Sequence, residues 1–394
     1  MPRPKHEEQL AGVMARRTGT SPDDWYLVFK ARYGMQLAFE AIARELGGGA
    51  VATQLLTCCT AVDPILVAGL EPVYSEVSAS TAAIDPLKMA RCDGLRAVVL
   101  QHTYGIIDVP SSIELADAAH AAGAVLVEDC AHCVGRMAAR GDGSPVADIS
   151  IHSFGVEKML DSHFGGVVWV NPRSEFAGVV RSLREALDAL PEPPARLDFL
   201  ARAYLTENRV LVHSPRALSR WLRRALPALG LFEPAVSEEE RSGTLSRKAY
   251  RPSRRICAQA AEALDGLDAR LAQHAAAVAV YRDAFAAMPG VRPLAATMDG
   301  PVQPLLRFPI LVRDTATADR VTAAVCAAGY YTTAWYRPEL GPGVLDASAY
   351  RLPRDRSHLR VCDELVACVA TLPANISVDG AREVSRVVAG VVSS

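Results

Sequence analysis

The sequence predicts an α/β protein with a large, mostly parallel central sheet and a smaller α+β domain at the C-terminal end. First, strand-sized apolar runs alternate with helical stretches between about residues 50 and 171, the pattern of a parallel sheet. Second, these runs are apolar almost throughout, as in strands that are buried on both faces. Third, an Ala-rich stretch at 254–288 has the length of a helix that connects two domains.

The predicted elements follow in chain order. Apolar residues at helical spacing predict a helix over 35–46, starting at Met35, and the glycines at 47–49 end it. Strands are predicted over 51–56, 72–77, 97–102, 124–129, 147–154 and 165–171, and helices over 61–70 and 111–123. After the connecting stretch, a strand is predicted over 305–312 and helices over 315–329 and 379–392.

These elements suggest two domains. We expect a large domain over 1–253, a connecting helix over 254–288 and a small domain over 289–394. Residues 173–250 break the alternation of strands and helices and have the character of an insertion. Its Arg-rich part, "RALSRWLRRALPALGLF", carries Arg216, Arg220, Arg223 and Arg224 around Trp221. Two interpretations remain open: an amphipathic helix that docks on its own protein or on a partner subunit, or a phosphate-reading lid.

Composition excludes several classes of protein. The net charge of -2 gives no indication of a nucleic-acid partner. The longest apolar runs are strand-sized, far below the roughly 18 residues of a membrane-spanning helix. The first residues lack the apolar region of a secretory signal, so we expect a cytoplasmic protein. Nine cysteines, an odd and scattered set, indicate reduced thiols rather than a disulfide framework.

Polar residues stand where predicted strands end, which is where parallel sheets bind ligands. Asp129 directly follows an apolar strand and is either a helix N-cap or the partner of a buried cation. Lys158 follows the next strand, five residues after Ser153, in the layout of a lysine that forms a Schiff base. Gly34 precedes the predicted helix at Met35, where free N–H groups could bind a phosphate.

A Cys-x-x-Cys motif lies between these residues, at Cys130 and Cys133. A thioredoxin-like redox pair or a zinc site would explain it. A zinc site would need a second ligand pair of similar spacing, and the adjacent Cys58 and Cys59 point apart in an extended segment. Packing is therefore favoured, and we expect no metal.

Several segments together resemble the DegT/DnrJ/EryC1/StrS family, the sugar aminotransferases of fold type I that use pyridoxal 5′-phosphate. The matching motifs are "GLEPVYSEV" (69–77), "HTYG" (102–105), "EDCAHCVG" (128–135), "ADISIHSFGVEK" (147–158), "GGVVWVN" (165–171) and, more weakly, "VATLPANISVDGAREVSRVV" (369–388). The resemblance spans most of the chain except 173–250.

The resemblance implies a role for each matching residue. Lys158 would form the Schiff base with the cofactor and move the proton during the reaction, and Asp129 would pair with the pyridinium nitrogen. His132 would lie beside the ring. Ser153 and the amides of Gly34, Met35 and Gln36 would hold the phosphate, and Cys58 stands where the family has a stacking aromatic residue.

The chain departs from the family mainly around the expected substrate. The family's "SGT" is "YGM" here, so a hydroxyl to the phosphate is lost. Its "GEGG" is "HFGG" with His163, and its "Y-x-x-x-H" segment becomes "WYRPELGP" (335–342) without the histidine. A family Asn that reaches the neighbouring subunit is missing near "KAYRPSRR" (248–255), where Arg251 is the candidate replacement. The cofactor residues are retained while the substrate residues have changed.

The resemblance implies a homodimeric aminotransferase. It would take an amino group from glutamate or a similar donor and pass it to a keto-sugar or another small polar ketone in a biosynthetic pathway. Two alternatives stay open: the same cofactor used for elimination, dehydration or another carbanion reaction, or a non-catalytic relic subunit. Stoichiometric transfer of the amine from glutamate distinguishes the first hypothesis from the others.

Overall fold

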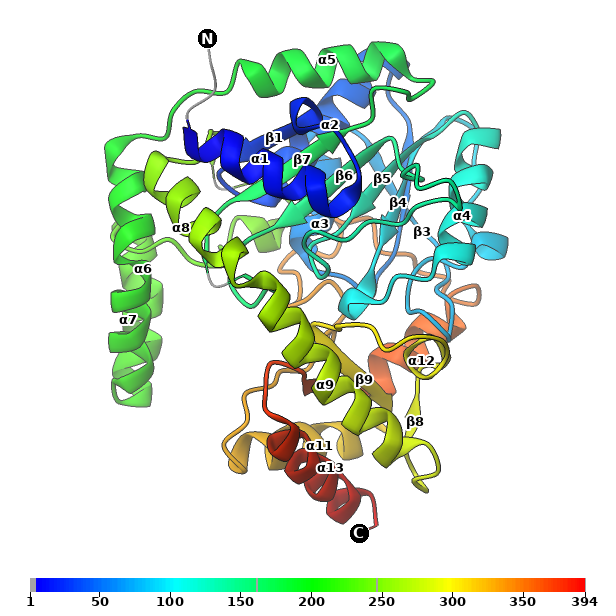
Figure 1. Ribbon diagram of the computed structural model, residues 1–394, viewed down its shortest axis with the longest axis vertical. Helices are drawn as coiled ribbons and strands as arrows, with labels where there is room; N and C mark the ends of the chain where they lie inside the picture. Colours follow the sequence, from blue (N-terminus) through cyan, green and yellow to red (C-terminus); the bar gives the residue numbers. More distant parts are fainter. Residues whose placement is uncertain (1–4, 161, 246, 394) are drawn as a thin grey trace.

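Two β-sheets organise the chain, a large one in the N-terminal part and a small one in the C-terminal part (Figure 1). The computed structural model describes residues 5–160, 162–245 and 247–393. The strands of the large sheet are β1 (Trp25–Val28), β2 (Ala50–Thr53), β3 (Glu71–Tyr74), β4 (Leu95–Gln101), β5 (Val125–Asp129), β6 (Ile149–Ser153) and β7 (Gly166–Val170). Their order is β1-β7-β6-β5-β4-β2-β3, and only β7 is antiparallel to its neighbours. The predicted, mostly parallel sheet is therefore confirmed.

Helices cover both faces of the large sheet because neighbouring residues of each strand point to opposite sides. In β5, Val125 and Val127 pack in one core, beneath α2 (Ala31–Leu46), α3 (Cys59–Val67) and α5 (Ala177–Asp188). Leu126 packs in the opposite core with α4 (Val109–Ala121). Further along that second face, α1 (Lys5–Thr18) and α8 (Arg254–Asp265) cover β1 and β7.

The small sheet has the order β10-β9-β8 and is antiparallel. Its strands are β8 (Arg292–Pro293), β9 (Arg307–Leu311) and β10 (Val369–Pro373). The helices α9 (Leu267–Phe285), α11 (Thr315–Ala327), α12 (Arg360–Cys368) and α13 (Val378–Val392) share one apolar core with it. The short α10 (Ala295–Met298) follows β8. The predicted strand at 305–312 and both predicted helices of this region are present.

Two predicted helices differ from the structure. The helix predicted from Met35 begins at Ala31, because the polar-looking "KARY" segment already follows a strand that the sequence did not reveal. The helix predicted over 254–288 is two helices, α8 and α9, which meet at Gly266. A glycine weakens a helix interior, so the chain can change direction there.

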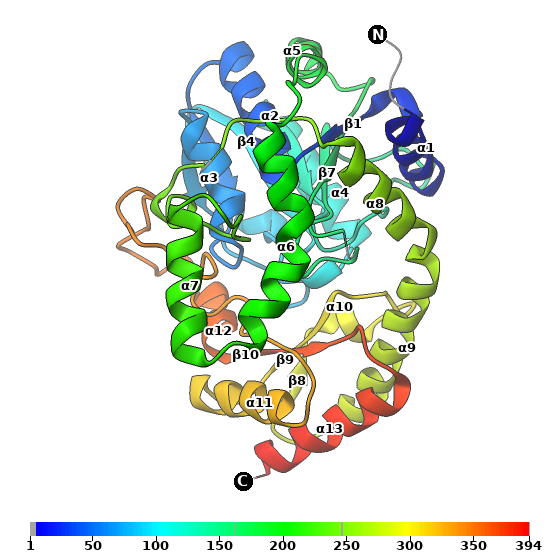
Figure 2. The same ribbon diagram turned by 90° about the vertical axis from the view of Figure 1, so that its left-hand side faces the viewer.

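The region 173–250 is not uniform. Its first helix, α5, belongs to the layer that covers the large sheet, since Val179 and Leu183 pack in the same core as Leu37 of α2. The next two, α6 (Ala195–His213) and α7 (Arg216–Ala228), form a hairpin at the side of the molecule (Figure 2). Trp221 on α7 is 63% exposed. None of the helices that the structure describes is long and apolar enough to cross a bilayer.

Candidate active site

A cavity of about 480 Å³ lies at the carboxyl ends of the parallel strands. Asp129 ends β5, Ser153 ends β6, and both line the cavity together with Lys158. Of the other predicted site residues, His132, Cys58 and Met35 also line it. The fold thus brings most of the predicted residues to one place.

Lys158 follows β6 and is partly buried in the cavity wall. Its Nζ lies 5.1 Å from the ring centroid of Trp335. Burial lowers the pKa of Lys158, and the charges of Cys58 and Asp129 oppose this shift only in part. A lowered pKa increases the fraction of neutral amine, the form that attacks a carbonyl group.

Asp129 offers a buried carboxyl to the same cavity and is only 7% exposed. Its Oδ1 accepts a hydrogen bond from the amide of Ala131 at 2.9 Å. Burial raises the pKa of Asp129, while this bond and the charge of Lys158 act in the opposite direction. A cation bound beside the carboxyl would offset the cost of burying its charge.

His132 is held as a neutral imidazole. Its Nδ1 accepts a hydrogen bond from the amide of Tyr104 at 3.0 Å, which places the remaining proton on Nε2. Nε2 can then donate to Oη of Tyr336, 3.0 Å away. Burial, together with the charge of Lys158, lowers the pKa of His132 well below 6.5. The ring is therefore a fixed, uncharged wall of the cavity.

Trp335 forms an aromatic wall that the sequence analysis did not assign to the site. Its ring stacks on His132 with centroids 5.2 Å apart and an angle of 13° between the planes. Lys158 Nζ and the guanidinium of Arg307 both lie over the same ring, at 5.1 and 5.5 Å. Two aromatic residues, Trp335 and Tyr336, are adjacent in a chain with 6% aromatic residues, and this pair was the sequence signal for an aromatic wall.

Of the three residues whose amides were predicted to bind the phosphate, Met35 lines the cavity, whereas Gly34 and Gln36 do not. The first residues of a helix have N–H groups that no helical carbonyl accepts. Because α2 begins at Ala31, these groups belong to Ala31 and Arg32, which line the cavity. Gly34 is packed on the sheet instead, where an added Cβ would lie 2.5 Å from Val168. The side chain of Gln36 bonds to Glu40, and neither Gly34 nor Gln36 is among the lining residues.

A network of charged side chains surrounds the start of α2, and the sequence motifs did not indicate it. Lys30 Nζ is 2.6 Å from Glu233, and Arg32 is 2.6 Å from Glu240. Burial opposes the charge of Arg32, but Glu240 and Cys58 outweigh it and raise the pKa of Arg32. Arg32 is thus a permanent cation at a helix start. The segment "FKAR" after the apolar "WYLV" was the signal for it.

Cys58 caps α3 at the cavity wall, and its Sγ accepts a hydrogen bond from Thr60 at 3.0 Å. Its hydrogen bond with Cys59 and the nearby Arg32 lower the pKa of the Cys58 thiol despite its burial. This residue therefore brings negative charge, not an aromatic face, to the cavity.

Some predicted residues stay outside the cavity. Arg251, the candidate replacement for the family's Asn, pairs with Glu7 at 2.7 Å. His163 does line the cavity. The insertion contributes Tyr204 of α6 to the lining, whereas Arg220, Arg223 and Arg224 of α7 are exposed and do not line it. The side chain of Arg216 lies outside the described residues.

Comparison with known proteins relates part of the chain to a family. Residues 30–186 match the model of the DegT/DnrJ/EryC1/StrS aminotransferase family. The match runs from the start of α2 into α5, and hence includes Arg32, Asp129, Ser153 and Lys158. It confirms the resemblance over these residues, which hold the motifs between 69 and 171, whereas the weaker motif at 369–388 lies outside the match. The family supports the expected class of enzyme, a transaminase that depends on pyridoxal 5′-phosphate. No curated protein sequence matches the chain.

Solved structures with a similar fold include three aminotransferase-related proteins. The aminotransferase TlmJ from Streptoalloteichus hindustanus has a TM-score of 0.69 at 18% identity, covering 99% of this chain and 92% of that one. DesI, solved in the presence of its TDP-sugar product, has a TM-score of 0.68 at 21% identity, with 98% and 85% covered. The PMP form of Spr1654 from Streptococcus pneumoniae, described as a sugar aminotransferase, has a TM-score of 0.69 at 17% identity, with 99% and 92% covered. These likenesses confirm the predicted fold, that of the fold type I transferases.

Proposed function

We propose that this protein transfers an amino group from glutamate or a similar donor to a keto-sugar or another small polar ketone, as a homodimer with pyridoxal 5′-phosphate bound in the cavity. The observation that carries the proposal is that Lys158 and Asp129, from consecutive strand ends, line one cavity with the start of α2. A reactive amine, a buried acid and an anion-binding helix start are the three groups that this cofactor requires.

The residues that line the cavity fit pyridoxal 5′-phosphate. Ala31, Arg32 and Ser153 would hold the phosphate, since a cationic side chain and free amides meet there. Arg32 would replace the hydroxyl that the family's motif supplies. Asp129 would hold a cationic ring nitrogen, for which its buried carboxyl is placed. When bound, pyridoxal phosphate supplies an electron sink for the carbanion formed on the substrate.

Lys158 would carry out the proton transfers. In its neutral state the amine can bond to an aldehyde, and once released it would take the proton from the α-carbon of the donor and deliver it to the cofactor carbon that carried the aldehyde. Burial in the cavity wall lowers the pKa of this amine and so increases its neutral fraction. The uncharged His132 and the stacked Trp335 exclude water from one side of it.

The test is reduction with borohydride after the cofactor is added. Wild-type protein should show a visible absorption band and, after reduction, a mass increase on the peptide that contains Lys158. Lys158→Ala should show neither, whereas Lys88→Ala, an exposed lysine outside the cavity, should behave as wild type. Equal labelling of wild type and Lys158→Ala would disprove the assignment.

A second measurement separates transamination from the alternatives. Glutamate should convert the bound cofactor to its amine form, with loss of the visible band and formation of one 2-oxoglutarate for each cofactor. A protein that binds the cofactor at Lys158 but leaves glutamate unchanged with every acceptor tested would instead support another carbanion reaction. The changed residues around the cavity, such as Trp335, are the reason to include this measurement.

A further inference from the structure

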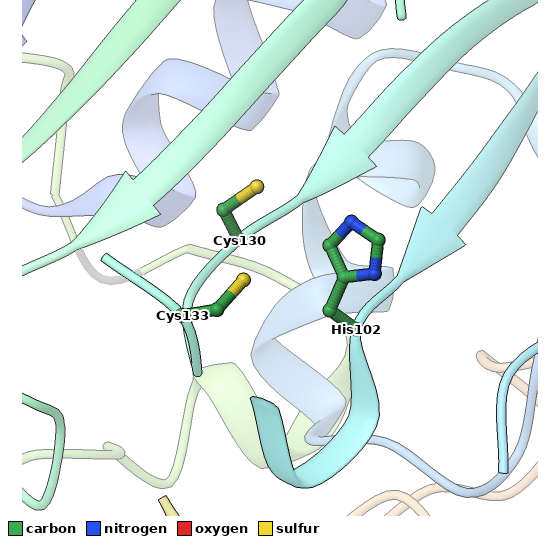
Figure 3. A group of neighbouring side chains, drawn as sticks. All are labelled: His102, Cys130 and Cys133. Atoms are coloured by element: carbon green, nitrogen blue, oxygen red, sulfur yellow. The ribbon is translucent and has the colours of Figure 1, made fainter. Parts of the chain in front are cut away.

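Three side chains that can bind a metal converge beside the candidate active site. His102 follows β4, and Cys130 and Cys133 follow β5, the neighbouring strand. One potential ligand atom from each lies within 4.8 Å of the other two (Figure 3). All three residues are buried, with at most 1% exposed. The three donors therefore face one another in a space from which bulk water is excluded.

The third donor, His102, lies far from the two cysteines in the sequence, so the spacing of the motif did not indicate it. A helix and a strand, α4 and β5, separate His102 from Cys130 along the chain. Parallel pairing places Gln101 beside Asp129, so the residues that follow the two strands lie next to each other. The missing second ligand pair, which argued against a metal in the sequence, is thus partly replaced by a histidine.

A carboxylate holds the imidazole of His102. Glu128 Oε1 lies 2.8 Å from its Nε2 and also accepts a hydrogen bond from the amide of Ala138 at 2.7 Å. The other carboxylate oxygen accepts one from the hydroxyl of Ser150. Histidines that bind metals usually have such a carboxylate partner, which fixes the ring and increases the basicity of the ligand.

From this arrangement we propose that Cys130, Cys133 and His102 form a zinc site. Two sulfurs and one imidazole nitrogen are the donors that zinc prefers, and they leave one tetrahedral position for an oxygen donor. Two thiol protons would be released to solvent on binding, and the two thiolates would neutralise the dication. That neutrality makes a fully buried site possible.

The position of the site suggests a structural role. The loop that contains the two cysteines also carries His132, whose imidazole bonds to Tyr104 and Tyr336. Zinc would fix this loop directly behind the cavity. Zinc binding itself does not depend on the proposed transamination, and it can be measured without the cofactor.

The experiment is a zinc titration of the reduced, metal-free protein, followed by elemental analysis after gel filtration. Wild type should retain about one zinc per chain. Cys133→Ser and Cys130→Ser should bind at least about 10-fold more weakly, and Glu128→Gln should weaken binding by about 10- to 100-fold through the ring of His102. Cys257→Ser removes a buried thiol outside the group and should bind as wild type does.

Cobalt in place of zinc gives a readout on wild type alone, in case a variant does not fold. It should produce the visible bands of a tetrahedral ion and a thiolate charge-transfer band. Wild type that retains less than about a tenth of a zinc per chain, or cobalt without a thiolate band, overturns the proposal. The proposal is also overturned if Cys130 and Cys133 form a disulfide in the purified protein that mild reduction does not open, because no thiolates are then available to zinc.

Discussion

At the scale of single residues, the amine of Lys158 is controlled by burial and by the charges near it. Because burial lowers its pKa, the neutral form is populated at lower pH than for a free lysine. The rate at which cofactor-free protein reacts with pyridoxal phosphate should rise as the pH passes through this lowered pKa. We expect the midpoint below 10.5, the ordinary value. A midpoint at or above that value would contradict the role of burial.

Replacing Cys58 provides a second test of this pH dependence. Its charge is the largest influence that raises the pKa of Lys158 against burial. Cys58→Ala should therefore move the midpoint to still lower pH. Replacing the exposed Cys92, which does not line the cavity, should leave the midpoint unchanged.

Trp335 should contribute to cofactor binding as the aromatic surface that Cys58 does not supply. Its ring is held by stacking on His132 and by the cations of Lys158 and Arg307. Contacts of these kinds contribute about 0.5–2 kcal/mol each. Trp335→Ala should weaken cofactor binding about 10-fold, and Trp335→Phe should retain most of the affinity. Titration of the visible band measures both, and an unchanged Kd for the alanine variant would exclude the role.

At the scale of elements, the close approach of α2 to the large sheet depends on Gly34. An added Cβ would lie 2.5 Å from a methyl group of Val168 on β7, a short and stiff side chain. Gly34→Ala should therefore destabilise the protein by about 1–2 kcal/mol, after the gain in helix propensity is subtracted. The cofactor affinity of the folded variant should change little, since Gly34 does not line the cavity.

Gly390→Ala is the control for this prediction, and urea unfolding measures both variants. Gly390 lies in α13 with no atom within 4 Å of an added Cβ. Its substitution should stabilise the protein by about 0.5–1 kcal/mol through helix propensity alone. If Gly34→Ala is as stable as Gly390→Ala, the contact with Val168 does not determine how closely α2 can pack on the sheet.

At this scale, the local sequence pattern predicted the strands in which almost every residue is buried. Strands β4 to β7 are apolar because both faces are covered, so their sequence alone identified them. The pattern failed for β1 and β10, which have four and five residues. Trp25 of β1 pairs with Trp169 of β7, and such distant pairing leaves no local signal.

The same reasoning explains what was found of the site. Asp129 and Ser153 end strands and Lys158 follows one, so their positions in the fold could be inferred from chain order. Arg32 depended on β1, and Trp335 enters the cavity from the other end of the chain, between α11 and α12. The proximity of His102 to the two cysteines likewise requires the pairing of β4 with β5.

At the scale of the whole molecule, we expect two chains to associate. The family resemblance implies sites at a subunit interface, so assembly and cofactor binding should be coupled. Sedimentation equilibrium should give twice the 42.1 kDa of one chain. Dilution that dissociates the protein should also release the cofactor. A monomer that keeps the visible band would show that one chain is sufficient.

The cavity is lined by residues from two parts of the chain, one built on the large sheet and one on the small sheet. Lys158 belongs to the part built on the large sheet, and Trp335 to the part whose residues pack with the small one. Any molecule that occupies the space between them makes contacts with both parts, and those contacts exist only while the two remain together. Saturating amounts of such a compound should thus raise the melting temperature of the protein.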